Sequence, residues 1–183
     1  MKTFTIRTGW IKFLLSWVII LIIRLIPFRP PNVEPILATL MPFSKRYSKI
    51  SIFLFGFMSM VVLDFVMSSV GIWTLITGTA YGLLGLWSCS YFEKRKGNIK
   101  NFVVFSIFGT LAYDFVTGLL IGPIFFGQPF LVALIGQIPF TLNHLVGNIA
   151  FAVILSPIIQ RWIVRNEKLE VSFIKQKLFG VSV

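Results

Sequence analysis

Charge is scarce in this sequence, and acidic charge most of all. Only 13% of the 183 residues are charged, with six Asp and Glu, one His and one Cys. The lone Cys89 excludes an internal disulfide and shows no metal-ligand spacing. HExxH, GxSxG, Walker A and Gly-rich dinucleotide motifs are all absent from the sequence, so nothing indicates the enzyme and nucleotide-binding classes that they mark. We therefore expect no cofactor, no metal, no ATP hydrolysis and no enzyme activity.

Apolar residues take the place of the missing charges. They make up 56% of the chain, with 20 Phe, and the mean hydropathy is +0.88, which is typical of a membrane protein. They extend over nearly the whole length, so no segment remains for a soluble domain. We predict one membrane domain over residues 1–165 and a cytoplasmic tail over residues 166–183. The basic N-terminus resembles a signal peptide, but Arg24 and Pro27 follow the apolar run in place of a cleavage site.

Six apolar segments predict an all-α integral membrane bundle of six transmembrane helices. A helix needs about 20 apolar residues to cross a bilayer. The segments are residues 10–28, 33–43, 50–67, 72–92, 101–121 and 131–164. The second is too short to cross without tilting or thinning the bilayer. The last exceeds one crossing and contains Pro139 and Pro157.

Basic residues predict the orientation of this bundle. With a cytoplasmic N-terminus, the inner segments are 1–12, 44–49, 93–100 and 161–183, and they hold all of the 17 Lys and Arg except Arg24 and Arg29. Basic loops remain cytoplasmic, so both termini are predicted to be cytoplasmic. The net charge of +11 then reports membrane topology, and no nucleic-acid partner is expected.

Polar residues inside the apolar segments are the candidate functional residues, because ionisable groups in a bilayer are costly and usually face a protein interior or a cavity. The last segment places Gln137, Thr141, His144 and Asn148 at positions i, i+4, i+7 and i+11, on one helix face. Segment 101–121 has a similar stripe, Ser106, Thr110, Asp114 and Thr117, with Tyr113 beside it. Hydrogen bonding between packed helices, without any ligand, would also explain these stripes.

A loose repeat ends in Asp-Phe-Val at Asp64 and again at Asp114, which predicts one carboxylate at matching depth in two parallel helices. Each carboxylate could instead reach the interface or cap a turn. The outer loop adds Arg24, Arg29, Asn32 and Glu34, with four prolines that would stiffen it as a gate. These groups and Gln128 are predicted to converge with the stripes on an outward-facing substrate pocket. The alternative role of the loop is to clasp the helix ends.

Two further segments are rich in small or aromatic residues. Gly78, Gly82 and Gly85 allow close helix approach, either inside the chain or, as a docking face, toward another membrane subunit. The outer loop GPIFFGQPF, residues 122–130, could cover the pocket or anchor at the membrane interface.

A family resemblance rests on the size of the chain, on its short second helix and on two segments. These segments are the loop RLIPFRPPNVEP and the stretch YDFVTGLLIGPIFFGQPF, which precedes a long last helix. Over residues 10–165 the chain resembles the substrate-binding S components of energy-coupling factor (ECF) transporters. The resemblance implies capture of a vitamin, related micronutrient or metal ion, with a transmembrane coupling subunit and two cytoplasmic ATPases as partners. It places Arg29, Asn32 and Glu34 at the gate, and Asp114, Gln137 and His144 in the lining. The family's Ala-x-x-x-Ala pattern is absent from the first helix.

Two other functions remain open. The segment LDFVMSSVGIWTLITGTAYGLLG also resembles a helical hairpin of small rod-shape membrane proteins, which would make the chain a scaffold with a filled polar cluster. An intramembrane enzyme would need Asp114 and His144 within about 3 Å of each other or bridged by one water. An outward cavity of about 300 Å³ or more, lined by the last-helix stripe, would favour transport.

Overall fold

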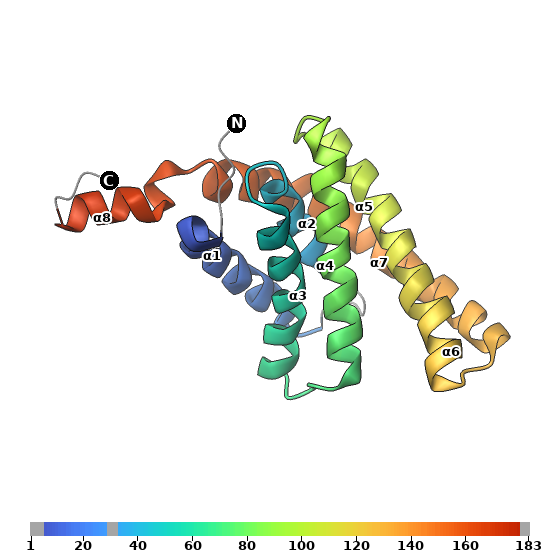
Figure 1. The fold of residues 1–183 in the computed structure, drawn as a ribbon. Coiled ribbons are helices and arrows are strands. Elements are labelled where there is room, and N and C mark those ends of the chain that lie inside the picture. The colour runs from blue at the N-terminus through green and yellow to red at the C-terminus, as the bar shows by residue number, and fades with distance from the viewer. Residues whose placement is uncertain (1–5, 29–32, 180–183) are drawn as a thin grey trace.

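The computed structural model of the chain describes residues 6–28 and 33–179, and every regular element in these ranges is helical. The α3–α4 turn and α6 lie at one end of the molecule, whereas the α4–α5 turn lies at the other (Figure 1). The elements are α1 (Ile6–Arg24), α2 (Ile36–Leu40), η1 (Met41–Phe43), α3 (Lys49–Val66), α4 (Ile72–Glu93), α5 (Ile99–Asp114), η2 (Phe115–Ile121), α6 (Gly122–Phe126), α7 (Phe130–Ile158), η3 (Ile159–Val164), η4 (Glu167–Leu169) and α8 (Val171–Phe179).

Three continuous helical stretches of the described chain are long and apolar enough to cross a membrane: Lys49–Val66, Ile99–Phe126 and Phe130–Val164. The last of these has an outward apolar face, because Ile135, Ile138, Leu142 and Val146 are all exposed. Such a face suits lipid and not water. The predicted all-α architecture is therefore confirmed in its helical content, and the chain has the character of a membrane protein.

Helix boundaries follow from local capping chemistry. The Ser48 hydroxyl accepts a hydrogen bond from the Ser51 amide at the start of α3, and the Asn98 side chain accepts one from the Asn101 amide at the start of α5. Such caps satisfy amides that the first helical turn leaves free. The first helix was predicted to reach residue 28 but ends at Arg24. Pro27 explains the early end, since it lacks an amide hydrogen and disfavours helix in the residue before it.

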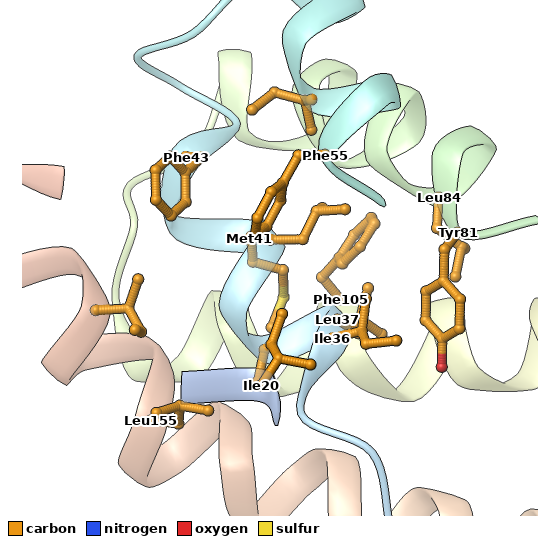
Figure 2. Close-up of a cluster of buried hydrophobic side chains, with 14 of the residues drawn as sticks. Ile20, Ile36, Leu37, Met41, Phe43, Phe55, Tyr81, Leu84, Phe105 and Leu155 are labelled. Carbon is orange, nitrogen blue, oxygen red and sulfur yellow. The ribbon is translucent and has the colours of Figure 1, made fainter. Parts of the chain in front are cut away.

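The second predicted crossing forms only short, buried helices and is not among the described stretches long enough to cross a membrane. Residues 36–43 form only α2 and η1, and all eight are buried. At 1.5 Å per residue the α-helical part covers less than about 10 Å. Figure 2 shows side chains of this segment, including Ile36, Leu37 and Met41, in one cluster with side chains from other helices, such as Phe55 and Phe105. The segment is thus the centre of the core.

Glycines on α4 allow it to pack closely against α3. A Cβ at Gly82 would lie 2.7 Å from the Phe53 ring, and one at Gly85 would lie 2.9 Å from the Ile52 carbonyl oxygen. Gly78 faces Phe57 in the same way. The assignment of Gly78, Gly82 and Gly85 to partner docking is therefore corrected, because α3 of the same chain already covers all three.

The helices that carry the two Asp-Phe-Val segments continue for different lengths after the motif. α3 ends at Val66, two residues after Asp64, whereas the helix that carries Asp114 continues through η2 and α6 to Phe126. Gly127, with φ of +64°, then ends α6 in the left-handed conformation that glycine adopts readily. The predicted loop over residues 122–130 is accordingly reduced to Gly127, Gln128 and Pro129.

The predicted tail is folded along the part of it that the structure describes. Glu170, just before α8, accepts from Lys12 of α1 and from Arg46, at 3.2 Å each. Both cations also donate to the Val164 carbonyl at 3.0 Å. These contacts hold the start of α8 against the end of the bundle where α1 begins, and they give the fully buried Lys12 its anionic partner.

Candidate functional site

The polar stripes of α5 and α7 face each other inside the protein. His144 Nδ1 lies 2.7 Å from Asp114 Oδ1, and Asn148 Nδ2 donates to Thr110 Oγ1 at 2.9 Å. Each of these four side chains is at most 3% exposed. The last two members of the α7 stripe, His144 and Asn148, are buried and both find partners on α5, whereas Gln137 and Thr141 are half-buried.

These buried groups have more hydrogen-bonding atoms than the surrounding protein satisfies. Asp114 Oδ2, His144 Nε2, Asn148 Oδ1 and Ser106 Oγ are all buried, and none has a hydrogen-bond partner among the described residues. Most buried polar atoms in proteins are paired, since an unpaired one costs about 1–3 kcal/mol. The concentration of four such atoms along the α5–α7 contact therefore distinguishes this region from ordinary helix packing.

Aromatic rings surround the Asp114–His144 pair. Tyr113 and Phe140 both present edge-to-face contacts to the imidazole, with ring centroids 5.6 and 5.8 Å away. Tyr113 also packs against Tyr81 of α4 at 4.7 Å. These rings exclude water from the sides of the pair and connect it to α4.

A second ion pair lies beyond Tyr81, where α1 ends. Arg24 forms a salt bridge with Glu34, and the other carboxylate oxygen of Glu34 accepts from the Tyr81 hydroxyl at 3.2 Å. Arg24 and Glu34 are thus brought together as predicted. The pair also clasps the end of α1 to the segment before α2, which was the alternative role. Arg29 and Asn32 lie outside the described residues.

A cavity of about 220 Å³, the outer cavity of the predicted topology, lies next to the buried pair along the helices. Its lining includes Thr117 and Gly118 of η2 and Gly136, Gln137 and Phe140 of α7. Gln137 donates to Thr141 at 3.1 Å. Phe140 contacts both the cavity and His144, whereas His144 and Asn148 do not line it. The cavity is smaller than the predicted 300 Å³. Gln137 lines it from the α7 stripe, and Thr117 lines it from the α5 stripe.

Gln128 and the phenylalanines of the predicted loop over residues 122–130 lie in different places. Gln128 lines the same cavity. Phe125, Phe126 and Phe130 are exposed, and Phe126 stacks on Trp73 at 4.8 Å. These rings therefore border the end of the bundle near α6 and do not cover the pair. A larger cavity of about 550 Å³, lined by Lys45, Lys49 and Glu93 among others, lies at the opposite end of the bundle.

Asp64 does not join the site. Its carboxylate accepts from Thr74 Oγ1 at 2.6 Å and from Ser69 Oγ at 3.4 Å. Thr74 Oγ1 in turn accepts from the Gly71 amide at 3.0 Å. This network closes the α3–α4 turn, so Asp64 caps a turn, as its alternative role required.

The chemistry available at the pair is acid–base and electrostatic. An imidazole held by a carboxylate at 2.7 Å meets the distance condition set for an intramembrane enzyme. However, no described hydroxyl or thiol is hydrogen-bonded to His144 Nε2. The described residues also contain no group of three or more His, Cys, Asp or Glu that could hold a metal ion.

Two contributors were missed by sequence reasoning. Tyr81 lies on the glycine-rich face of α4, where it is the one large hydrogen-bonding side chain between Gly78 and Gly85, and that contrast was the available signal. Phe140 gave no signal, because it is one of 20 Phe and only its contact with His144 identifies it. No protein-family model, curated protein or solved structure matches the chain.

Proposed function

We propose that this chain is the substrate-capture subunit of an ECF-type uptake transporter in the cell membrane. It binds a small micronutrient, such as a vitamin or related metabolite, from the outer side. In this proposal the bundle comprises six transmembrane segments with both termini cytoplasmic, and α2 with η1 is the short second segment inside the core. The family resemblance of the sequence and the polar interior of the α5–α7 pair both support this function.

The observation that carries the proposal is the set of buried polar atoms without partners. A scaffold needs its buried polar groups paired, because each unpaired group lowers stability without any compensating gain. A binding protein leaves such groups free until a ligand supplies the missing hydrogen bonds. Asp114, His144 and Asn148 fit the second pattern, since each pairs once across the α5–α7 contact and retains a free atom.

The size of the outer cavity limits how the ligand enters. At about 220 Å³ the cavity accommodates only part of a vitamin-sized molecule. Phe140 lines this cavity and contacts His144, so rotation of its ring would open the cavity toward His144. Side-chain rearrangements of this kind are common when ligands bind.

The energy for uptake would come from partner proteins. The sequence has no Walker A motif, so the proposal requires a transmembrane coupling subunit and two cytoplasmic ATPases. The docking face for that subunit is not the glycine face of α4, because α3 covers it.

An intramembrane enzyme is the second candidate, and the 2.7 Å separation of Asp114 and His144 favours it. The two functions differ in what they do to a bound molecule. A capture subunit returns its ligand unchanged, whereas an enzyme returns a product.

Native mass spectrometry of the purified protein, released gently from detergent, tests both functions. We expect a small molecule to co-purify with the wild-type protein and to be lost from Asn148→Ala. The matched control is Asn143→Ala on the exposed side of the same helix, which should retain the molecule. A protein free of any small molecule, together with His144→Ala and Glu34→Ala cells that take up every tested nutrient normally, would refute the transport function.

A further inference from the structure

Two of the unpaired buried atoms at and around Asp114 are hydrogen-bond acceptors and not donors. A carboxylate only accepts, so the short contact with His144 requires a proton on Nδ1. His144 Nε2 accepts in the neutral imidazole and donates in the charged one. Asn148 donates its amide hydrogen to Thr110, which leaves its carbonyl oxygen free. Two acceptors, Asp114 Oδ2 and Asn148 Oδ1, therefore lie on facing turns of α5 and α7 without described partners.

The charge of the Asp114 carboxylate also favours a cationic ligand. An ionised Asp114 is a buried negative charge, since Asp114 is 1% and His144 is 3% exposed, and its Oδ2 has no partner among the described residues. Burying such a charge is costly unless a cation compensates it. Arg24 forms its salt bridge with Glu34, and its buried Nε has no hydrogen-bond partner among the described residues.

The surrounding rings favour a cation too. Tyr113 and Phe140 flank the imidazole, and Tyr81 packs on Tyr113. Aromatic faces attract cations, and the attraction increases where water is excluded. Ser106, which can donate or accept, lies two turns before Asp114 on α5 and suits either kind of ligand.

Resting on the proposed function, we infer that the captured ligand presents a protonated, N–H-rich nitrogen group, such as an amine, an amidine or an amino-substituted nitrogen heterocycle, to Asp114, His144 and Asn148. Asp114 Oδ2 takes the charge-assisted hydrogen bond, Asn148 Oδ1 accepts a further N–H group, and so does His144 Nε2 in its neutral form. The outer cavity then holds the rest of the molecule, with Gln137 and Gln128 within its lining.

Three single-ring probes of nearly one shape test this inference: benzamidine, benzamide and benzoate. They carry a cationic, a neutral and an anionic group on the same ring. Each is titrated into the purified full-length protein in lipid nanodiscs while thermal unfolding is followed. We expect benzamidine to raise the unfolding temperature, benzamide to bind at least about tenfold more weakly, and benzoate to have no effect. A tenfold change corresponds to about 1.4 kcal/mol of binding free energy.

A matched pair of variants assigns the effect to one carboxylate. Asp114→Asn should abolish the preference for benzamidine over benzamide, whereas Asp64→Asn, in the α3–α4 turn, should preserve it. The wild-type comparison stands even where Asp114→Asn fails to fold. Equal binding of all three probes, preference for benzoate, binding of none, or loss of preference in Asp64→Asn would overturn the inference. A neutral or anionic co-purified molecule in native mass spectrometry would overturn it as well, while leaving the capture function intact.

Discussion

The two Asp-Phe-Val segments share a local sequence but have opposite surroundings. Asp64 lies in the α3–α4 turn, where Thr74 and Ser69 satisfy its oxygens. Asp114 lies inside the α5–α7 pair, where one oxygen contacts His144 and the other has no described partner. The difference arises from the length of helix after each motif, because α3 ends two residues after Asp64, whereas the helix with Asp114 continues to Phe126.

The same contrast extends to the helices that carry the two motifs. α3 and α4 pack so closely that glycine is required at several contacts. The α5–α7 pair instead contains polar stripes and two prolines within α7, and the π-helical segments η2 and η3 continue α5 and α7. Segments of π-helix occur often at functional sites. The α3–α4 pair is therefore closely packed, whereas the α5–α7 pair has features that are common at functional sites.

The largest effect should come from breaking the Asp114–His144 pair. His144→Leu leaves a buried carboxylate without its partner, so the free energy of unfolding should fall by about 3–5 kcal/mol. The double variant Asp114→Leu with His144→Leu removes the stranded charge, so its stability should return to the wild-type level or exceed it. Chemical unfolding in mixed micelles measures both values. A double variant less stable than His144→Leu would show that the pair supports the fold and not a site.

A smaller effect should distinguish glycines in the two helix pairs. A Cβ at Gly56 of α3 would lie 2.5 Å from the Tyr81 carbonyl oxygen, whereas Gly136 of α7 has no other group within 4 Å. Gly56→Ala must separate α3 from α4, so we expect a loss of about 1–3 kcal/mol. Gly136→Ala should be neutral or stabilise by up to about 1 kcal/mol, because alanine favours helix.

Thermal unfolding of the two glycine variants side by side provides the measurement. Gly56→Ala should also weaken the binding of any co-purified molecule, because Tyr81 holds Glu34 through a hydrogen bond. Equal stabilities for the two variants would mean that α3 and α4 are no more tightly packed than α7.

The sequence predicts the long helices well, because hydropathy alone defines segments 50–67, 72–92 and 131–164 to within a few residues. It also predicts the inward faces of α5 and α7, because helical periodicity places their polar residues on one side. Prediction from the sequence fails where the position of a segment depends on its three-dimensional surroundings. Segment 33–43 is apolar, which suits either a membrane span or a protein core. The packing of other helices around α2 places it in the core.

The site shows the same limit. Asp64 and Asp114 are indistinguishable by local sequence, since hydrogen-bond partners from distant residues decide their roles. Thr74 is ten residues from Asp64, and His144 is 30 residues from Asp114. Tyr81 and Phe140 enter the site only through contacts with other helices. The glycines of α4 predict close packing correctly, but they do not specify which helix packs there.

The smallest effect should come from the Asp64 network itself. Thr74→Val keeps the shape of the side chain but removes the hydroxyl that donates to Asp64 and accepts from Gly71. Because Asp64 is only half-buried, water can replace the lost partner. We therefore expect a loss of about 1 kcal/mol in the free energy of unfolding, and Thr74→Ser should restore most of it. Binding of a co-purified molecule should not change in either variant. A loss of binding in Thr74→Val would place Asp64 in the site after all and remove the contrast between the two carboxylates.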